Sequence, residues 1–178
     1  NSSKSSMFLN KIKNFIIKKI VSKSLSNVRS VASDGTIKTV GIIYDESNLS
    51  GREDLILKLV KFGIEDSAIK VLVFRDNIKK KEVFNYSVFS NKEVSWSATF
   101  DKPEMFSFVT TGFDLLINYY DIEKTPLVLV SHQSKAKFKV GFAAIDKRVN
   151  HFMIDANAQN CQVFVDELFK YLKILNKI

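Results

Sequence analysis

Two short apolar, β-branched segments lie on either side of an amphipathic one, and this pattern constrains the fold of the 178-residue chain most strongly. Residues 36–44 (TIKTVGIIY) and 68–76 (AIKVLVFRD) have the composition of buried strands. Between them, residues 53–62 carry apolar side chains at helical spacing, and Gly63 ends the run. A strand, a helix and a second strand in this order predict a right-handed β-α-β unit with parallel strands.

The rest of the chain continues this alternation. We predict strands at 82–90, 93–100, 113–120, 125–132 and 151–156, and helices at 103–111, from Ser134 to near Gly141, and at 158–177. Most of these strands are apolar on both faces, which is typical of a sheet covered by helices on both sides. The predicted fold is therefore a single three-layer α/β domain over residues 34–178. Its sheet is open, mostly parallel and doubly wound, of the Rossmann or flavodoxin-like kind.

The positive charge of the chain is concentrated near the N-terminus. Residues 1–33 contain seven of the 27 basic residues and none of the 19 acidic ones, so they carry +7. The remaining 20 bases and 19 acids nearly cancel. Long-range attraction to an acidic partner should therefore come from this N-terminal arm, whose basic residues are Lys4, Lys11, Lys13, Lys18, Lys19, Lys23 and Arg29.

Residues 7–33 are predicted to begin with a basic amphipathic helix. An apolar stripe of Phe8, Ile12, Phe15, Ile16 and Ile20 follows helical spacing, while Ile17 and Val21 fall off it. In one interpretation, the stripe packs on the body and the lysines are solvated. In the other, the helix docks on RNA or a ribonucleoprotein through Lys11, Lys13, Lys18, Lys19, Lys23 and Arg29, or less plausibly on a membrane surface, since the arm lacks Trp and Tyr.

Residues 1–6 have neither periodicity nor apolar content, and we interpret them as residues left from expression. Lysines interrupt every apolar run of the arm, so it is not predicted to be a signal peptide or a transmembrane segment. The single cysteine, Cys161, favours a reducing compartment, and we expect a cytoplasmic protein.

Candidate ligand-binding residues follow the predicted strands, because ligands of open α/β sheets bind beyond the carboxyl ends of the strands. Asp45 ends the first strand. A Ser-rich turn and lysines that begin a predicted helix could hold a phosphate or carboxylate, and a charged pair precedes the last strand. The candidates are Asp45, Ser131, His132, Ser134, Lys135, Lys139, Asp146 and Arg148. Alternatively, Ser134 is a helix N-cap, the lysines are a solvated face, and Asp146 and Arg148 form a structural ion pair.

The sequence carries no motif of a known catalytic or cofactor-binding site. It lacks the Gly-rich dinucleotide and phosphate loops, the nucleophile elbow and the zinc-protease motif. Two histidines and one cysteine without ligand spacing predict no transition-metal site, and we predict no cofactor. Cys161, at the start of a predicted helix, would have a lowered pKa if it were exposed there. An enzymatic activity stays open, but a non-catalytic role is favoured.

Three segments resemble a family of short uncharacterised proteins from Bacteroidota. They are FDLLINYYD (113–121), SKAKFKVGFAAIDKRVNHFMIDAN (134–157) and ELFKYLKILNKI (167–178), and the similarity extends from Met7 to the C-terminus. The resemblance implies a bacterial cytosolic protein. It implies no activity, but it directs attention to Ser134, Lys135, Lys139, Asp146, Arg148 and Asn150.

The leading functional hypothesis is a non-catalytic interaction protein that presents its basic N-terminal helix to RNA or a ribonucleoprotein. The second is an enzyme or sensor that binds a small anion, such as a nucleotide or carboxylate, at the strand ends. The third is a structural subunit with the arm buried between copies. The sequence leaves the strand order and the oligomeric state open.

Overall fold

A six-stranded, wholly parallel sheet forms the centre of the computed structural model, which describes residues 2–25 and 35–178. Its strands are β1 (Val40–Asp45), β2 (Ile69–Phe74), β3 (Ser87–Phe89), β4 (Leu115–Tyr119), β5 (Phe138–Phe142) and β6 (Phe152–Ile154). They lie in the order β3-β2-β1-β4-β5-β6. The direction of winding thus reverses between β1 and β4, which confirms the predicted doubly wound, Rossmann-like fold.

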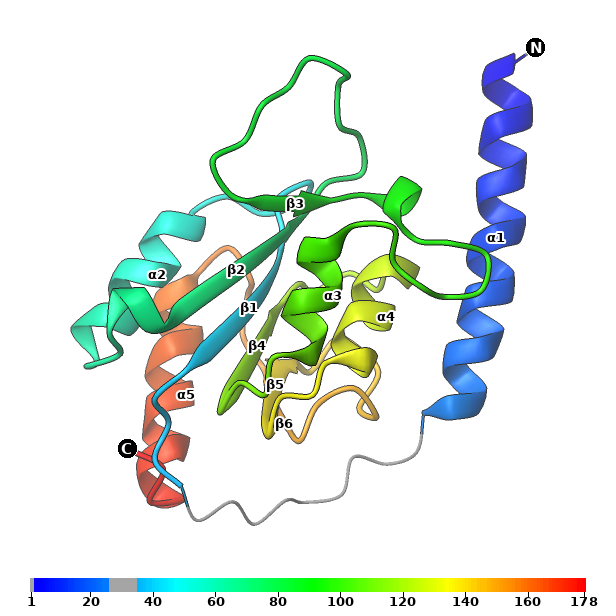
Figure 1. Cartoon of the computed structure of the whole chain (residues 1–178). Helices are drawn as coiled ribbons and strands as arrows, with labels where there is room; N and C mark the ends of the chain where they lie inside the picture. The colour runs from blue at the N-terminus through cyan, green and yellow to red at the C-terminus, as the bar shows by residue number, and fades with distance from the viewer. Residues whose placement is uncertain (1, 26–34) are drawn as a thin grey trace.

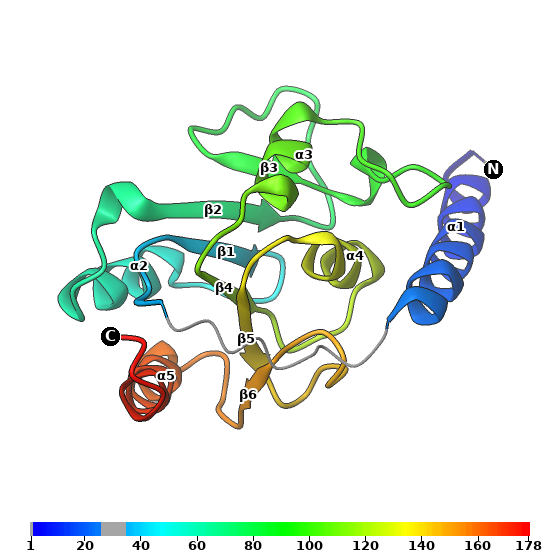
Figure 2. The same cartoon turned by 60° about the horizontal axis from the view of Figure 1, so that its bottom comes forward.

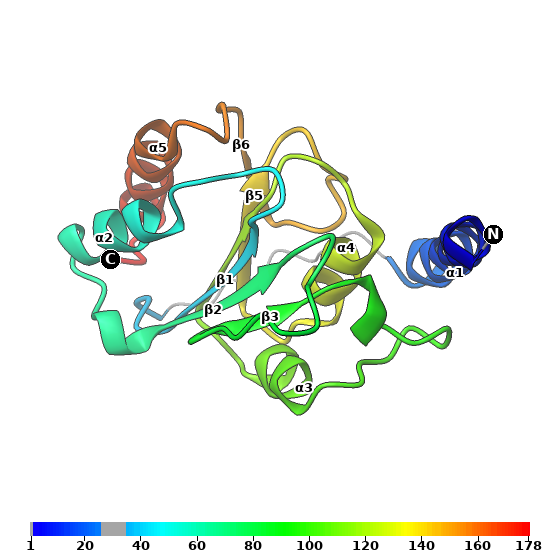
Figure 3. The same ribbon diagram turned by 90° about the horizontal axis from the view of Figure 1, so that it is seen from above.

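Helices cover both faces of the sheet (Figures 2 and 3). One face carries α2 (Arg52–Lys61) and α5 (Cys161–Ile174), which pack on each other, and the other carries α3 (Pro103–Thr110) and α4 (Thr125–Gln133). Each helical layer closes a separate hydrophobic core on its side of the sheet. Two one-turn 3₁₀ helices, η1 (Asp66–Ala68) and η2 (Asn91–Glu93), complete the body.

The central strand β1 is buried along its whole length, as its apolar sequence predicts. Gly41 is required there, because a Cβ atom at this position would lie 2.6 Å from the ring of Phe113. This close approach lets the chain that enters β4 pack directly against the β1 backbone.

An N-terminal helix, α1 (Ser2–Ser24), lies outside these three layers and packs on α4. It is the outermost element on its side of the molecule, and its N-terminal half extends past the body (Figure 1). The helix begins inside residues 1–6, the segment interpreted as left from expression.

Several predicted elements are wrong. Residues 125–132 form α4 and not a strand, and the following segment, predicted as a helix ending near Gly141, contains β5. The strand predicted at 93–100 is reduced to a single bridge between Val94 and Phe100, and of the strand predicted at 82–90 only β3 forms. The strands predicted at 36–44, 68–76, 113–120 and 151–156 are confirmed in shorter form, as are the other helices.

Candidate functional site

The body holds α1 through three residues on successive turns of its inner side. Ile17 and Val21 are buried and belong to the core formed with α3 and α4. Lys13 is buried with them, and its Nζ donates hydrogen bonds to the carbonyl oxygens of Asn91, at 2.6 Å, and Val94, at 2.9 Å. These three residues are the seat of α1.

The Lys13 ammonium and the C-terminal end of α1 are both held by the body. Burial removes water from the Lys13 ammonium and lowers its pKa, although Asp101 and Glu93 act in the opposite direction. At the end of the helix, Ser24 Oγ lies 2.9 Å from Nε2 of His132 on α4 and hydrogen-bonds to it. Lys13, predicted as a nucleic-acid contact, is therefore turned into the protein.

The apolar stripe predicted from the sequence lies on the side of α1 that is turned away from the seat. We call this side the outer face, and its large apolar side chains are all exposed: Phe8, Leu9, Ile12, Phe15, Ile16 and Ile20. The expectation that this stripe packs on the body is wrong. The residues that do pack, Ile17 and Val21, are the two that fell off the stripe. The body contacts only the narrow side of α1 that carries them, and the longer apolar pattern of the stripe made this side hard to recognise in the sequence.

The remaining lysines of α1 stay in solvent. Lys4, Lys11 and Lys18 recur every seven residues, close to two helical turns, and so form one row beside the outer face. Lys19 and Lys23 lie on the outer face near its C-terminal end. Arg29 lies outside the described residues. The exposed surface of α1 thus combines large apolar side chains with five lysines and no acidic residue.

A buried ion pair lies at the carboxyl ends of the strands, where β1 and β4 separate. Asp45 is 1% exposed, and one of its carboxylate oxygens lies 2.9 Å from the Lys124 ammonium. The same carboxylate accepts hydrogen bonds from the Ser47 amide, at 3.0 Å, and the Asn48 side chain, at 2.8 Å. Lys124 also pairs with Asp76 at 2.9 Å. Its side chain therefore occupies the crevice in which such folds bind ligands.

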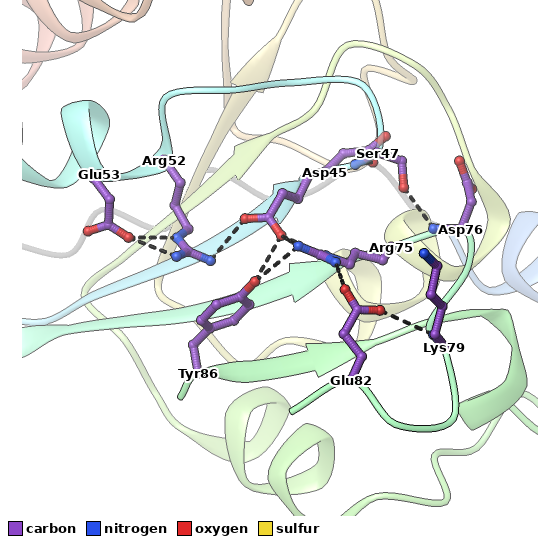
Figure 4. Close-up of polar contacts among 10 residues, drawn as sticks. Asp45, Ser47, Arg52, Glu53, Arg75, Asp76, Lys79, Glu82 and Tyr86 are labelled. Atoms are coloured by element: carbon purple, nitrogen blue, oxygen red, sulfur yellow. Dashed lines mark hydrogen bonds and ion pairs between the residues drawn. The ribbon is translucent and has the colours of Figure 1, made fainter. Parts of the chain in front are cut away.

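A second polar network continues from this point along the edge of the sheet (Figure 4). The Glu46 carboxylate pairs with Arg52, at 3.1 Å, and with Arg75, at 2.7 Å, and it accepts a hydrogen bond from the Tyr86 hydroxyl at 3.0 Å. Arg75 also pairs with Glu82 at 2.6 Å. Each of the cations Lys124, Arg52 and Arg75 thus already has a carboxylate partner.

The predicted anion-binding residues from Ser131 to Lys139 lie at the amino ends of the strands, away from Asp45. Because residues 125–133 form a helix, His132 lies in the last turn of α4, and Ser134 and Lys135 follow it. A helix C-terminus carries partial negative charge, so the N-terminal anion site expected here does not form. Lys139 instead donates from Nζ to the Ser131 carbonyl oxygen at 2.7 Å, and burial, followed by the charge of Lys135, lowers its pKa to about 8.

Ser131 belongs to a buried polar cluster beneath α4. Its hydroxyl lies 2.8 Å from the Tyr120 hydroxyl and donates to Asn118 Oδ1 at 2.7 Å. The Asn118 amide donates in turn to Asn150 Oδ1 at 2.7 Å. Ser131, Asn118 and Asn150 are all buried, so these contacts fix the packing of α4 on the sheet.

Asp146 and Arg148 form an ion pair at the carboxyl ends of the strands, on the same side of the sheet as Asp45. The hydrogen bond from Arg148 lowers the pKa of Asp146, and the Asp146 amide donates to Glu123 at 2.6 Å. A cavity of about 70 Å³ lies beside this pair, between the C-terminal half of α1 and the start of α4. The geometry matches the structural ion pair that the sequence left as an alternative.

The surroundings of Cys161 do not favour its thiolate form. Cys161 Sγ lies 2.9 Å from a carboxylate oxygen of Asp54 and donates to it. Burial, together with this hydrogen bond, raises the pKa of Cys161 to about 11. The lowered pKa considered for a cysteine at a helix start is therefore not found.

Lys124, Arg75 and Glu46 were not among the candidates predicted from the sequence. Arg75 lies near the end of the strand predicted at 68–76, and Glu46 lies two residues after the strand predicted at 36–44, so their positions at the strand ends could have been read from the sequence. Lys124 could not, because it was placed before a predicted strand, whereas it precedes α4.

A family model described as a family of unknown function, DUF6913, matches residues 13–175. The chain belongs to this family. The DUF6913 match begins at Lys13, the first residue of the seat, and ends just after α5, so the part of α1 ahead of the seat lies outside it. Comparisons with curated proteins and with solved structures give no match. No helix in the described ranges combines the length and apolar character needed to cross a bilayer.

Proposed function

We propose that this DUF6913 protein is a non-catalytic interaction protein that docks on an acidic partner through α1. The exposure of the outer face carries the proposal. Phe8 and Phe15 are 64% and 69% exposed, on a helix that has lysines and no acid. Contiguous apolar side chains in solvent mark binding surfaces. Because the body is nearly neutral, the charge of α1 would orient the molecule toward its partner.

The charge of the arm makes RNA or a ribonucleoprotein in a bacterial cytoplasm the partner expected from sequence. Lys11 and Lys18 lie on one side of α1 and could follow a phosphate backbone, and both are exposed. The arm would then act as an anchor, with the α/β domain carried beside the RNA.

Binding of the full chain to bulk transfer RNA across a salt series tests this partner. Each phosphate contact contributes about −0.7 on single strands to about −0.9 on a duplex to the slope of log affinity against log salt. The double variant Lys11→Gln/Lys18→Gln should therefore reduce the magnitude of the slope by about 1.4–1.8. The matched control, Lys80→Gln/Lys81→Gln, changes two exposed lysines of the body and should leave the slope unchanged. An equal effect of both pairs would contradict docking through α1.

A small-anion site at the strand ends, the second hypothesis, has less support. Of the candidate residues, only Asp45, Asp146 and Arg148 lie at that edge, and each is engaged in an ion pair. A thermal-shift screen of phosphate- and carboxylate-bearing compounds tests it, and a stabilising compound whose effect Arg148→Ala removes would revive it.

A further inference from the structure

The outer face of α1 requires apolar surface from its partner as well as negative charge. We infer that α1 binds the surface of an anionic phospholipid bilayer, lying parallel to it with the outer face among the acyl chains. This inference rests on the docking through α1 proposed above and names its partner.

The chemistry of the outer face favours lipid over RNA. An RNA surface presents phosphates and ribose, so the six apolar side chains of the outer face would remain in contact with water or charge. A bilayer interface accepts apolar side chains below the headgroups and cations at the level of the phosphates. The five exposed lysines of α1 also oppose pairing with the same helix of a second copy.

The position of α1 fits a flat partner. The outer face is turned away from the seat, with Phe8 and Phe15 farthest from it and Ile20 next to Lys13. The body is therefore beside and behind α1 when the outer face is in contact. Because α1 is the outermost element on its side, a planar surface can reach it without meeting the sheet or the other helices (Figures 1 and 3).

The lysines are arranged for such an interface. The row of Lys4, Lys11 and Lys18 beside the outer face would lie at headgroup depth. Lys19 and Lys23, on the outer face itself, have long aliphatic stems that allow their ammonium groups to reach the phosphates while the stems stay in apolar surroundings. Each basic side chain near an anionic surface contributes to binding.

The body supplies an aromatic residue that the arm lacks. Trp96, the only tryptophan of the chain, is 48% exposed and follows Val94, whose carbonyl oxygen accepts the hydrogen bond from Lys13. The segment that carries Trp96 is thus fixed to α1. Tryptophan is enriched at membrane–water interfaces, so Trp96 would enter the headgroup region beside the helix.

Co-sedimentation of the full chain with vesicles tests the inference, using phosphatidylcholine vesicles with and without phosphatidylglycerol. We expect binding to the anionic vesicles only. Phe8→Ser/Phe15→Ser should weaken it at least about 100-fold, since each buried Phe contributes about 1.5–3 kcal/mol. Lys11→Gln/Lys18→Gln should weaken it about 30-fold, at about 1 kcal/mol for each lysine. Phe106→Ser, in α3, is the control, because Phe106 is 64% exposed like Phe8.

The outcomes separate the inference from the proposed function. Equal binding to neutral and anionic vesicles, no binding to either, or equal effects of the Phe8/Phe15 and Phe106 substitutions would overturn the inference. If the chain then binds transfer RNA through Lys11 and Lys18, the partner is nucleic acid and the proposed function stands. If it binds neither lipid nor RNA through α1, both fail.

Trp96 gives a second measurement on the unmodified protein. Its fluorescence emission should shift to shorter wavelength on anionic vesicles, and the Phe8→Ser/Phe15→Ser variant should lose this shift at the same lipid concentration. Unchanged emission of the wild-type chain at saturating lipid would overturn the role given to Trp96.

Discussion

At the scale of single residues, Lys124 should have a large effect on stability. It is the cation that compensates the buried carboxylate of Asp45, and removing one partner of a buried pair leaves an unpaired charge. We expect Lys124→Met to lower the free energy of unfolding by about 3 kcal/mol. Urea denaturation measures the change.

A second substitution tests the cause of that loss. Adding Asp45→Asn to Lys124→Met removes the buried charge and should recover most of the stability. The control Lys170→Met breaks an ion pair whose lysine side chain is 67% exposed, and it should cost less than about 1 kcal/mol. A double variant as unstable as Lys124→Met alone would show that Lys124 acts through packing.

Asp114 should make stability depend on pH in acid. Partial burial opposes ionisation, but the Lys137 ammonium at 2.8 Å and the amides of Lys38 and Thr39, each at 3.0 Å, lower the pKa of Asp114 to about 2. In an unfolded chain the pKa is about 3.9. The stabilisation is therefore complete above about pH 5 and is lost as the pH falls toward 2.

The variant Asp114→Asn checks this assignment. Its free energy of unfolding should be lower than that of the wild type at pH 6, and the two curves should converge as the pH approaches 2. Parallel curves across this range would contradict the assignment of acid sensitivity to Asp114.

At the scale of elements, we expect α1 to depend on its seat and the body to remain folded without α1. The core beneath it is formed mainly by α3, α4 and the sheet. Ile17→Asp places a charge in the seat, so α1 should detach and become readily cleaved by trypsin at its lysines, while the α/β body resists. The neighbouring Ile16→Asp, on the outer face, should leave the cleavage rate unchanged. Loss of the whole fold in Ile17→Asp would show that α1 is part of the core.

The two neighbouring elements that were exchanged, at 125–132 and from Ser134 to near Gly141, were predicted wrongly for different reasons. Residues 126–130 form a short apolar run, and such a run has the same pattern in a buried helix and a buried strand. Thr125-Pro126 was the available signal, because proline favours the first turn of a helix. In the next segment, apolar Ala136, Phe138 and Val140 alternate with lysines at the period of a strand, and this pattern was overlooked.

At the scale of the whole molecule, the layered architecture could be predicted and the strand order could not. Strands such as β1, apolar on both sides, require helices on both faces of the sheet. The order of the strands depends on which long-range pairs form, and the local pattern does not contain this. The candidate site was predicted only in part for the same reason. Asp45 was placed correctly at the carboxyl end of a strand. Because a strand and a helix were exchanged at 125–140, the residues between Ser131 and Lys139 were predicted at the carboxyl ends of the strands, whereas they lie at the amino ends.

The N-terminal half of α1 has no support from the body. Every residue from Lys4 to Ile12 is exposed, and the seat begins at Lys13. Isolated helices shorter than about 12–15 residues are marginal in water. The backbone amides ahead of the seat should therefore exchange their hydrogens rapidly in the free protein and slow down on a bound surface, which hydrogen–deuterium exchange can measure. Part of the free energy of association would then be used to order the residues from Lys4 to Ile12. The affinity for the partner would therefore depend on the helix propensity of these residues as well as on the contacts that they make.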